Sequence, residues 1–447
     1  MAYVPHTEEE RREMLSAIGV ERMEDLYDAV PKDALSPDLG LPEGISEMEA
    51  MQEFGAMSEA NADTRHFACF LGAGAYNHFI PSVVDHILRR NEFYTAYTPY
   101  QPEVSQGTLQ AIFEFQSLIC NLTGMDVANA SHYDGATALA EGVILALNQF
   151  RFRRKKMILS PSIHPHYREV VRTYMNGIDL EIVGDEVLEN DAETLAGMLD
   201  DNTAMIAVQY PDFFGRVQDY TALGEAVHAA GALFVVVVNP LALGLLKPPS
   251  EFGADIVLGE GQPLGIPLSY GGPYLGLFAT REKLVRKIAG RIVGETTDSR
   301  GQRGYVLTLT PREQHIRRER ATSNICSNQG LMALAAATYM SVMGKKGLKQ
   351  VAELSYQKAH YAAQEIAKLD GFSVWSDAVF FNEFVVECPM PVADLNDALL
   401  DYDILGGYDL GQSFDQLKDH MLVAVTEMNS KDEIDDFVSA LAEVSNA

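Results

Sequence analysis

The sequence predicts an α/β fold in which a mostly parallel β-sheet forms a large domain, followed by a smaller α+β domain. One observation is alternation, because short apolar segments and stretches with helical periodicity follow each other between residues 105 and 310. A second is the run Leu233–Val238, six consecutive apolar residues, which is typical of a strand buried on both faces. The third is the length of 447 residues, which suits a large domain with smaller additions.

Six apolar segments are predicted to be strands of the large domain, with helices between them that cover both faces of the sheet. The predicted strands are Met157–Ser160, Leu180–Val183, Met205–Gln209, Leu233–Val238, Asp255–Leu258 and Tyr274–Ala279. The predicted helices are Thr137–Phe150, Tyr167–Met175, Ala192–Leu199, Tyr220–Ala230 and Glu282–Ile292.

Residues 1–60 are predicted to be a polar helical arm. Thr7 and Glu10 form a capping box that opens a helix over Glu8–Ile18. We interpret this part either as an arm that wraps another subunit or as a cap on the same core. Two further short helices are expected, at Met23–Val30 and Ser46–Glu53.

Residues 345–447 are predicted to form the small α+β domain, so that the large domain spans residues 61–344. A long helical stretch over Gln329–Met343 and Leu348–Leu369 leads into the small domain. Its predicted strands are Phe372–Trp375, Phe384–Glu387 and Met421–Val425, and its predicted helices are Val392–Asp401 and Lys431–Val444.

Composition and charge narrow the classes of function. An apolar content of 47% and a charged content of 22% indicate an ordinary globular protein. The formal net charge of −29, from 63 acidic and 34 basic residues, repels nucleic-acid phosphates and anionic membranes, so neither is an expected partner. Four scattered cysteines, without a signal sequence or a membrane-spanning apolar run, predict a soluble cytoplasmic protein.

A loop rich in aromatic hydroxyls is the first candidate for binding. It runs from Phe93 to Gly107, and Pro99 and Pro102 predict that it is extended rather than helical. Its phenol and hydroxyl groups suit binding of a carboxylate or lining of a pocket mouth; the alternative is that the tyrosines only pack against the sheet. The candidate residues of this tyrosine loop are Tyr94, Tyr97, Thr98, Tyr100 and Gln101.

Three other motifs carry weaker signals. Residues 131–138 place small and hydroxyl side chains at a predicted helix N-terminus, a natural phosphate seat, but Asp134 would oppose a phosphate and is better explained as the N-cap. Residues 71–76 lack the third glycine of a dinucleotide fingerprint and predict a tight turn. His164 and His166 have no third ligand at a supporting spacing, so no metal site is predicted.

Two positions at strand ends lack groups that a pyridoxal-phosphate enzyme of the aminotransferase type would have there. Such enzymes carry their Schiff-base lysine in a strand-to-loop segment like residues 255–276, but Gln262 stands where the lysine is expected, and an amide cannot form that link. They also place an aspartate at the end of a strand like Leu233–Val238, where it pairs with the pyridine nitrogen. Asn239 is neutral and would not hold that nitrogen charged.

Several long segments, in order, together resemble the glycine decarboxylase P-protein of the glycine cleavage system. The match is to its N-terminal (alpha) half, which in many prokaryotes is a separate chain, subunit 1. The segments span nearly the whole sequence, although the last hundred residues add little. They are residues 5–19, 70–81, 93–107, 259–276 and 312–326.

The resemblance implies a type I pyridoxal-phosphate fold and a part in an oxidoreductase complex that decarboxylates glycine and passes the aminomethyl group to the lipoyl arm of the H-protein. In the split family the sister chain, subunit 2 (beta), carries the lysine. Pyridoxal phosphate is therefore expected on that partner, and none is expected to be bound covalently here. Because active sites of this fold lie at subunit interfaces, a half with no catalytic residue of its own can still supply side chains to its partner.

The tyrosine loop is then expected to reach the partner's substrate pocket, and a basic segment near residue 320 is a weaker candidate for the pocket or interface. One alternative is a cofactor-free scaffold or regulatory protein that binds the catalytic chain or the H-protein. Another is an independent enzyme that uses pyridoxal phosphate non-covalently or not at all, against which Gln262 and Asn239 weigh. The candidates in the basic segment are Arg317, Arg318, Thr322, Ser323 and Asn324.

Overall fold

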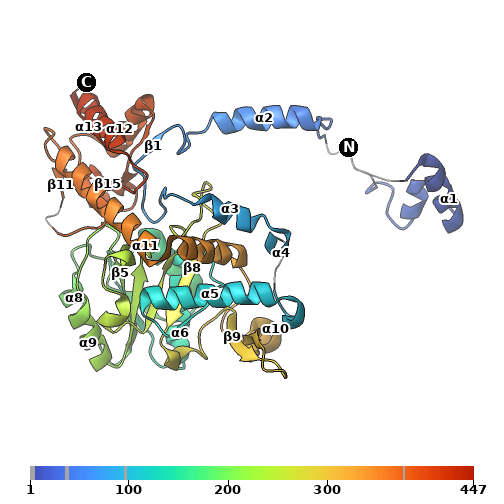
Figure 1. The fold of residues 1–447 in the computed structure, drawn as a ribbon, viewed down its shortest axis with the longest axis horizontal. Coiled ribbons are helices and arrows are strands. Elements are labelled where there is room, and N and C mark those ends of the chain that lie inside the picture. Colours follow the sequence, from blue (N-terminus) through green and yellow to red (C-terminus); the bar gives the residue numbers. More distant parts are fainter. Residues whose placement is uncertain (1–5, 36–39, 95–97, 376–377, 447) are drawn as a thin grey trace. The chain divides into compact units, whose positions relative to one another are not determined.

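The computed structural model describes residues 6–35, 40–94, 98–375 and 378–446. The chain divides into two compact units, Met1–Asp63 and Thr64–Ala447. The ribbon in Figure 1 is coloured along the sequence, so the first unit is blue and the end of the second unit is red.

The first unit contains two capped helices. The side chain of Thr7 accepts from the Glu10 N–H, and the Glu10 carboxylate accepts from the Thr7 N–H, so α1 (Glu8–Ile18) begins where it was predicted. Ser46 caps α2 (Glu47–Glu59) in the same way, and this helix is longer than predicted. Only the 3-10 turn η1 (Met23–Tyr27) forms in the remaining predicted segment. None of these three elements has a buried residue.

A seven-stranded sheet forms the centre of the second unit, with the strand order β2-β8-β7-β6-β5-β3-β4. Strands β3 to β7 are parallel, whereas β8 is antiparallel to β7 and β2 is antiparallel to β8. The six predicted strands are all present, which confirms the mostly parallel sheet. The strands are β2 (Val127–Ala128), β3 (Lys156–Leu159), β4 (Glu181–Val183), β5 (Thr203–Tyr210), β6 (Leu233–Val238), β7 (Ile256–Glu260) and β8 (Gly276–Thr280).

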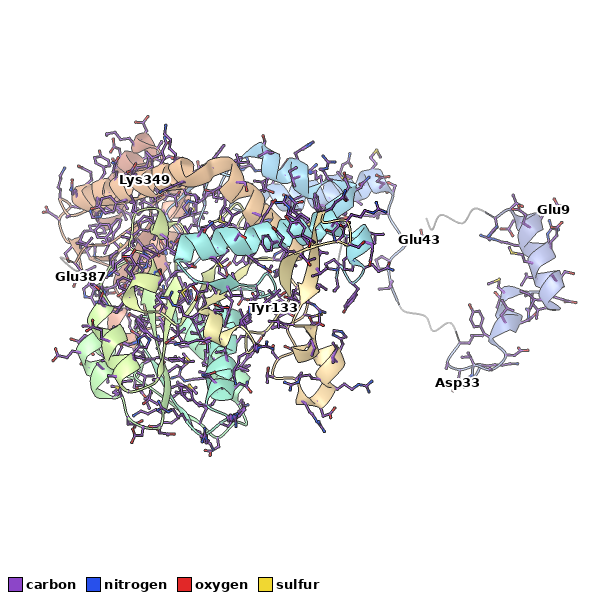
Figure 2. The ribbon with its side chains drawn as sticks, turned by 60° about the horizontal axis from the view of Figure 1, so that its bottom comes forward. Glu9, Asp33, Glu43, Tyr133, Lys349 and Glu387 are labelled. Atoms are coloured by element: carbon purple, nitrogen blue, oxygen red, sulfur yellow. The ribbon has the colours of Figure 1, made fainter. Side chains whose placement is uncertain are left out.

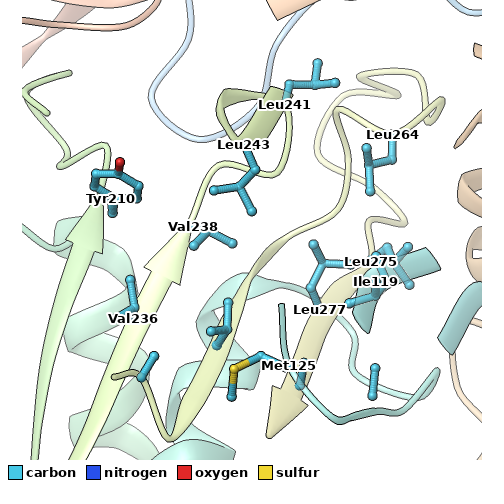
Figure 3. Packing of buried hydrophobic residues seen from close by; sticks show 14 of the residues in the cluster. Ile119, Met125, Tyr210, Val236, Val238, Leu241, Leu243, Leu264, Leu275 and Leu277 are labelled. Carbon is cyan, nitrogen blue, oxygen red and sulfur yellow. The ribbon is translucent and has the colours of Figure 1, made fainter. Parts of the chain in front are cut away.

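Helices cover both faces of this sheet, as continuous apolar strands require. Alternate residues of β6 point in opposite directions. Val236 packs in one cluster with Phe115 of α5, and Figure 3 shows part of this cluster, whereas Val235 packs in a second cluster with Leu139 of α6. The helices are α3 (Ser82–Leu88), α4 (Asn91–Tyr94), α5 (Gln106–Thr123), α6 (Gly135–Gln149), α7 (Pro165–Met175), α8 (Ala192–Gly197) and α9 (Thr221–Ala229).

A long helix leads from the large sheet to a small one. α11 (Gly330–Ile366) is interrupted at Gly344, where φ is 59°, close to the predicted gap between two helical stretches. The small antiparallel sheet has the order β11-β12-β15-β14, and β1 pairs with β13 beside it. Figure 2 labels Lys349 on α11 and Glu387 at the end of β12. The elements are β1 (Ala68–Cys69), β11 (Ser373–Val374), β12 (Glu383–Glu387), α12 (Val392–Leu399), β13 (Ile404–Leu405), β14 (Tyr408–Asp409), β15 (His420–Ala424) and α13 (Lys431–Asn446).

The predicted helix over Glu282–Ile292 is wrong. Only the 3-10 turn η5 (Glu282–Leu284) forms, and a hairpin of β9 (Ile292–Thr297) and β10 (Arg303–Thr308) follows. The physical reason lies at Gly290, whose φ of +80° is incompatible with a helix and brings the backbone against the 129–131 segment.

The region around the tyrosine loop is also more helical than predicted. α4 ends at Tyr94, the 3-10 turn η2 (Pro102–Val104) begins at a proline, and the unpredicted α5 follows. Proline is favoured at the first position of a helical turn, where no N–H donor is needed. Other short turns are η3 (Ala242–Gly244), η4 (Pro249–Phe252), η6 (Thr310–Arg312), α10 (Gln314–Arg317), η7 (Arg318–Arg320), η8 (Leu400–Tyr402), η9 (Leu410–Gln412) and η10 (Asp415–Leu417).

Within the described residues, no helix combines the length and the apolar character needed to cross a membrane.

Candidate functional site

A small cavity lies at the carboxyl ends of β6 and β7, the edge at which parallel α/β sheets bind ligands. Asn239 directly follows β6, and Glu260 is the last residue of β7. Both line the cavity, together with His164, Tyr167 and Gln209. Its volume is about 30 Å³, which leaves room for only a few water molecules.

Among the described residues, the partners of the amides at the two predicted cofactor positions are backbone groups. Gln262 is 1% exposed; its oxygen accepts from the Tyr76 N–H at 2.9 Å, and its nitrogen donates to the carbonyls of Tyr76 at 2.9 Å and Ile266 at 2.7 Å. The side-chain oxygen of Asn239 accepts from the Leu241 N–H at 3.1 Å. Gln262 therefore fastens the segment around Tyr76 to the turn after β7, and Asn239 stabilises its own turn.

A carboxyl group from the same chain occupies the N-terminal end of α6, where the sequence suggested a phosphate seat. One oxygen of Glu260 accepts from the Gly135 N–H at 3.0 Å, and the other accepts from the N–H groups of Gln262 and Leu275 at 2.9 and 3.2 Å. Burial raises the pKa of Glu260 to about 8, although these three N–H donors pull it downward. The Gly135 N–H at the start of α6, a donor that could hold a phosphate, is therefore engaged.

Pyridoxal phosphate does not fit this cavity. Asp134 caps α6 by accepting from the Thr137 N–H at 2.7 Å, which confirms its predicted role, so two carboxyl groups stand where a phosphate would rest. The ring of Tyr167 also fills this end: a Cβ built on Gly135 would come within 2.4 Å of its hydroxyl. Neither the cavity lining nor position 262 offers a lysine.

The segment at residues 72–79 joins the cavity to the small sheet. The predicted tight turn is present, and the Ala73 N–H and the Tyr76 hydroxyl each donate to the Glu383 carboxylate at 2.7 Å. Burial raises the pKa of Glu383, the first residue of β12, to about 7. A second contact of this segment with a buried carboxylate joins His78 Nδ1 to Glu427 at 2.7 Å. The large and small sheets are thus fastened together through buried carboxyl groups.

The tyrosine loop is anchored by two hydroxyl groups at its centre. Thr98 donates to the Ser327 hydroxyl at 2.6 Å, and the Tyr100 hydroxyl accepts from Arg291 at 3.1 Å. The outward parts of the loop are open, since Tyr94 is 66% exposed and Tyr100 is 59% exposed. Gln101 is also exposed, whereas Tyr97 lies outside the described residues.

Arg291 connects this loop to two further segments. Its side chain is 3% exposed; Nε donates to the Ser327 hydroxyl at 3.1 Å, Nη2 contacts the Cys326 sulfur at 3.0 Å, and Nη1 pairs with Glu313. Burial alone would raise the pKa of the Cys326 thiol, but the hydrogen bond and charge of Arg291 lower it below its ordinary value.

The basic segment and Glu313 line one cavity. Arg317, Arg318, Thr322 and Asn324 are exposed, and the Ser323 hydroxyl donates to the buried Glu141 carboxyl at 2.8 Å. Burial raises the pKa of Glu141 to about 7. The cavity has a volume of about 160 Å³, and the charged residues in its lining are Arg286, Lys287, Glu313 and Arg317. Arg291 therefore contacts the tyrosine loop at Tyr100 and the residues on either side of the basic segment, Glu313 and Cys326.

Sequence reasoning missed three residues of this arrangement: Glu260, Arg291 and Glu383. Glu260 and Glu383 stand at the ends of β7 and β12, outside the predicted strands, where an acidic residue is ordinary, so no signal in the sequence indicated that either would be buried. Arg291 was hidden in the segment wrongly predicted as a helix. Its neighbour Gly290 was the available hint of a turn there.

Comparisons with known proteins agree on one family. The model of the family described as glycine cleavage system P-protein matches residues 1–441. A protein of Thermomicrobium roseum named "Probable glycine dehydrogenase (decarboxylating) subunit 1" is 54% identical over 100% of both chains. A protein of the same name from a Geobacillus species is 52% identical, over 99% of this chain and 98% of its own.

Solved structures agree on the fold. A crystal structure of glycine decarboxylase (P-protein) of the glycine cleavage system, in inhibitor-bound form, has a TM-score of 0.90 at 41% identity and covers 99% of this chain and 100% of that one. The sphingosine-1-phosphate lyase of Burkholderia pseudomallei has a TM-score of 0.65 at 15% identity, covering 93% and 94%, which is a likeness of fold alone. The predicted type I fold of pyridoxal-phosphate enzymes is confirmed.

Proposed function

The chain belongs to the glycine cleavage system P-protein family, and we propose that it is the subunit 1 half of a two-chain glycine decarboxylase. In this assignment pyridoxal phosphate is bound by subunit 2, where glycine loses carbon dioxide. The aminomethyl group then passes to the lipoyl arm of the H-protein. This chain supplies side chains to the partner's site and is inactive alone.

The observation that carries the proposal is the small cavity at the ends of β6 and β7, whose volume is only about 30 Å³. Gln262 is committed to backbone hydrogen bonds, and at the α6 N-terminus the Glu260 carboxyl group engages the Gly135 N–H while Asp134 engages the Thr137 N–H. A chain with this arrangement cannot hold the cofactor that the chemistry of the family needs. The cofactor therefore belongs on another chain, and this one acts by contributing to a shared site.

The tyrosine loop is the part that we assign to the shared site. The Tyr100 hydroxyl accepts a hydrogen bond from Arg291, so its own O–H remains free to donate to a substrate carboxylate. Tyr94 and Tyr100 are more than half exposed in this chain by itself. In the complex these surfaces, and the exposed Gln101, would be covered by subunit 2.

The proposal is tested by reconstituting this chain with subunit 2 and lipoylated H-protein and measuring glycine-dependent release of carbon dioxide. Tyr97→Phe and Thr98→Ala should each lower the rate at least about tenfold, the effect of losing ~1.4 kcal/mol of transition-state stabilisation, with assembly unchanged by size-exclusion chromatography. Tyr402→Phe is the matched control, because its hydroxyl donates to Glu443 on the small domain, and it should keep full activity.

A scaffold that never lines the site makes the opposite prediction. In that case Tyr97→Phe and Thr98→Ala would be as active as the control, although the chain would still be needed for assembly. Full activity of both variants would refute the assignment of the tyrosine loop.

A further inference from the structure

The turn before Arg291, which places its side chain in the interior, requires glycine at position 290. Gly290 has a φ of +80°, and a Cβ at that position would lie 2.7 Å from the Cβ of Ser131. The Arg291 N–H donates to the Ser131 hydroxyl at 3.0 Å, which fixes its backbone before β9 begins. The guanidinium group is therefore held from a rigid support at the edge of the large sheet.

The guanidinium group contacts three segments that are far apart in the sequence. It donates to Tyr100 in the tyrosine loop and to Ser327 after the basic segment, and it pairs with Glu313. Its carbon also lies 5.4 Å from the centre of the Tyr100 ring, within the range of a cation–π contact. Thr98 adds a second link between the loop and Ser327.

These contacts exceed what is needed to neutralise a buried charge. Glu313, also buried, provides the opposite charge, and the ion pair alone would satisfy the charge of Arg291. The remaining donors point to Tyr100 and Ser327, which belong to or adjoin the proposed shared site. A planar group with donors on several edges can hold two loops at a fixed angle, which a lysine ammonium cannot do.

We propose that Arg291 is the positioning residue of the shared site: it sets Tyr100 and the loop that carries it in the orientation that the partner chain uses. This inference rests on the proposed function. Arg291 itself is buried and touches no substrate. Its effect on the reaction passes through the Tyr100 hydroxyl, which it orients so that the O–H points away from the guanidinium group.

The test is a double-mutant cycle in the reconstituted complex, with kcat and KM for glycine measured separately. Arg291→Lys keeps a positive charge beside Glu313 but loses the fork, and Tyr100→Phe removes the oriented hydroxyl. Each should lower kcat/KM at least about tenfold. The kcat/KM of the double variant should be no lower than that of the less active single variant. That non-additivity is expected when one residue acts only through the other. Arg303→Lys, an exposed arginine that stacks on Tyr305, is the matched control and should stay within about twofold of the wild type.

Losses that multiply in the double variant would overturn the inference, because they would mean that Arg291 acts independently of Tyr100. Full activity of Arg291→Lys would also overturn it. If Arg291→Lys does not assemble, Ser327→Ala takes its place, since that hydroxyl accepts from both Arg291 and Thr98. A non-additive loss with Tyr100→Phe then supports the inference, and an additive one refutes it.

The same experiments separate this inference from the proposed function. If Tyr97→Phe and Thr98→Ala impair the reaction while Arg291→Lys does not, the function stands and the role of Arg291 is wrong. If all of them are silent, the assignment of the tyrosine loop itself has failed.

Discussion

Replacing Gln262 with leucine tests whether the residue at the expected lysine position serves stability. Leucine has nearly the volume of glutamine but no polar atoms, so the substitution leaves the Tyr76 N–H and the carbonyls of Tyr76 and Ile266 without their partner. An unpaired buried backbone group costs about 1–3 kcal/mol, so three such groups should lower the free energy of unfolding by about 3–9 kcal/mol. Urea denaturation measures the change, provided that the slope with denaturant is unchanged.

Gln110→Leu is the matched control, because the Gln110 amide donates to the carboxylate of Glu114 one turn away on the surface of α5. It should change stability by less than about 0.5 kcal/mol. A loss below about 1 kcal/mol for Gln262→Leu would refute the reasoning. It would mean that the segment around Tyr76 is held by other contacts and that Gln262 is free to play a different part.

Two other substitutions probe the buried carboxyl groups and the close packing. Burial raises the pKa of Glu141 from 4.5 to about 7, so its contribution to stability is full below pH 4.5 and is lost as the pH rises through 7. Glu141→Gln should therefore stabilise the protein at pH 8, by up to about 3 kcal/mol, and give no gain at pH 4.5; equal melting temperatures at pH 8 would contradict this. Gly215→Ala should lower the melting temperature strongly, because φ is +84° and the new Cβ would lie 1.9 Å from the Glu383 carbonyl oxygen. Gly301→Ala has a similar φ of +77° but nothing within 4 Å, so it should cost only about 1 kcal/mol; equal losses would mean that the Glu383 contact is unimportant.

The central sheet could be predicted because its signal is local. A run such as Leu233–Val238 removes all its apolar side chains from water only as a strand in a sheet that is covered on both faces. The structure has it as such a strand. Capping boxes are equally local, which is why the start of α1 was correct. The prediction failed at residues 282–292, where the turn at Gly290 and the burial of Arg291 depend on contacts with residues 129–131 and 313.

The candidate site could be predicted only in part. The absence of a lysine and an aspartate is visible in the sequence, but the use made of Gln262 is not, because its partner Tyr76 lies 186 positions away. Glu260 looks like the polar end of a strand until three N–H groups from separate segments are seen around it. The role of Arg291 is equally hidden in the sequence, because it depends on which loops the fold places around the guanidinium group.

The most direct test of the account follows the cofactor between the two chains of an active complex. This chain would be mixed with subunit 2, pyridoxal phosphate and glycine-free buffer, reduced with borohydride, and each chain weighed by intact mass spectrometry. The account predicts a pyridoxyl phosphate adduct on subunit 2, none on this chain, and glycine-dependent release of carbon dioxide only from the unreduced mixture of both. A stoichiometric adduct on this chain, with activity from this chain alone, would contradict it.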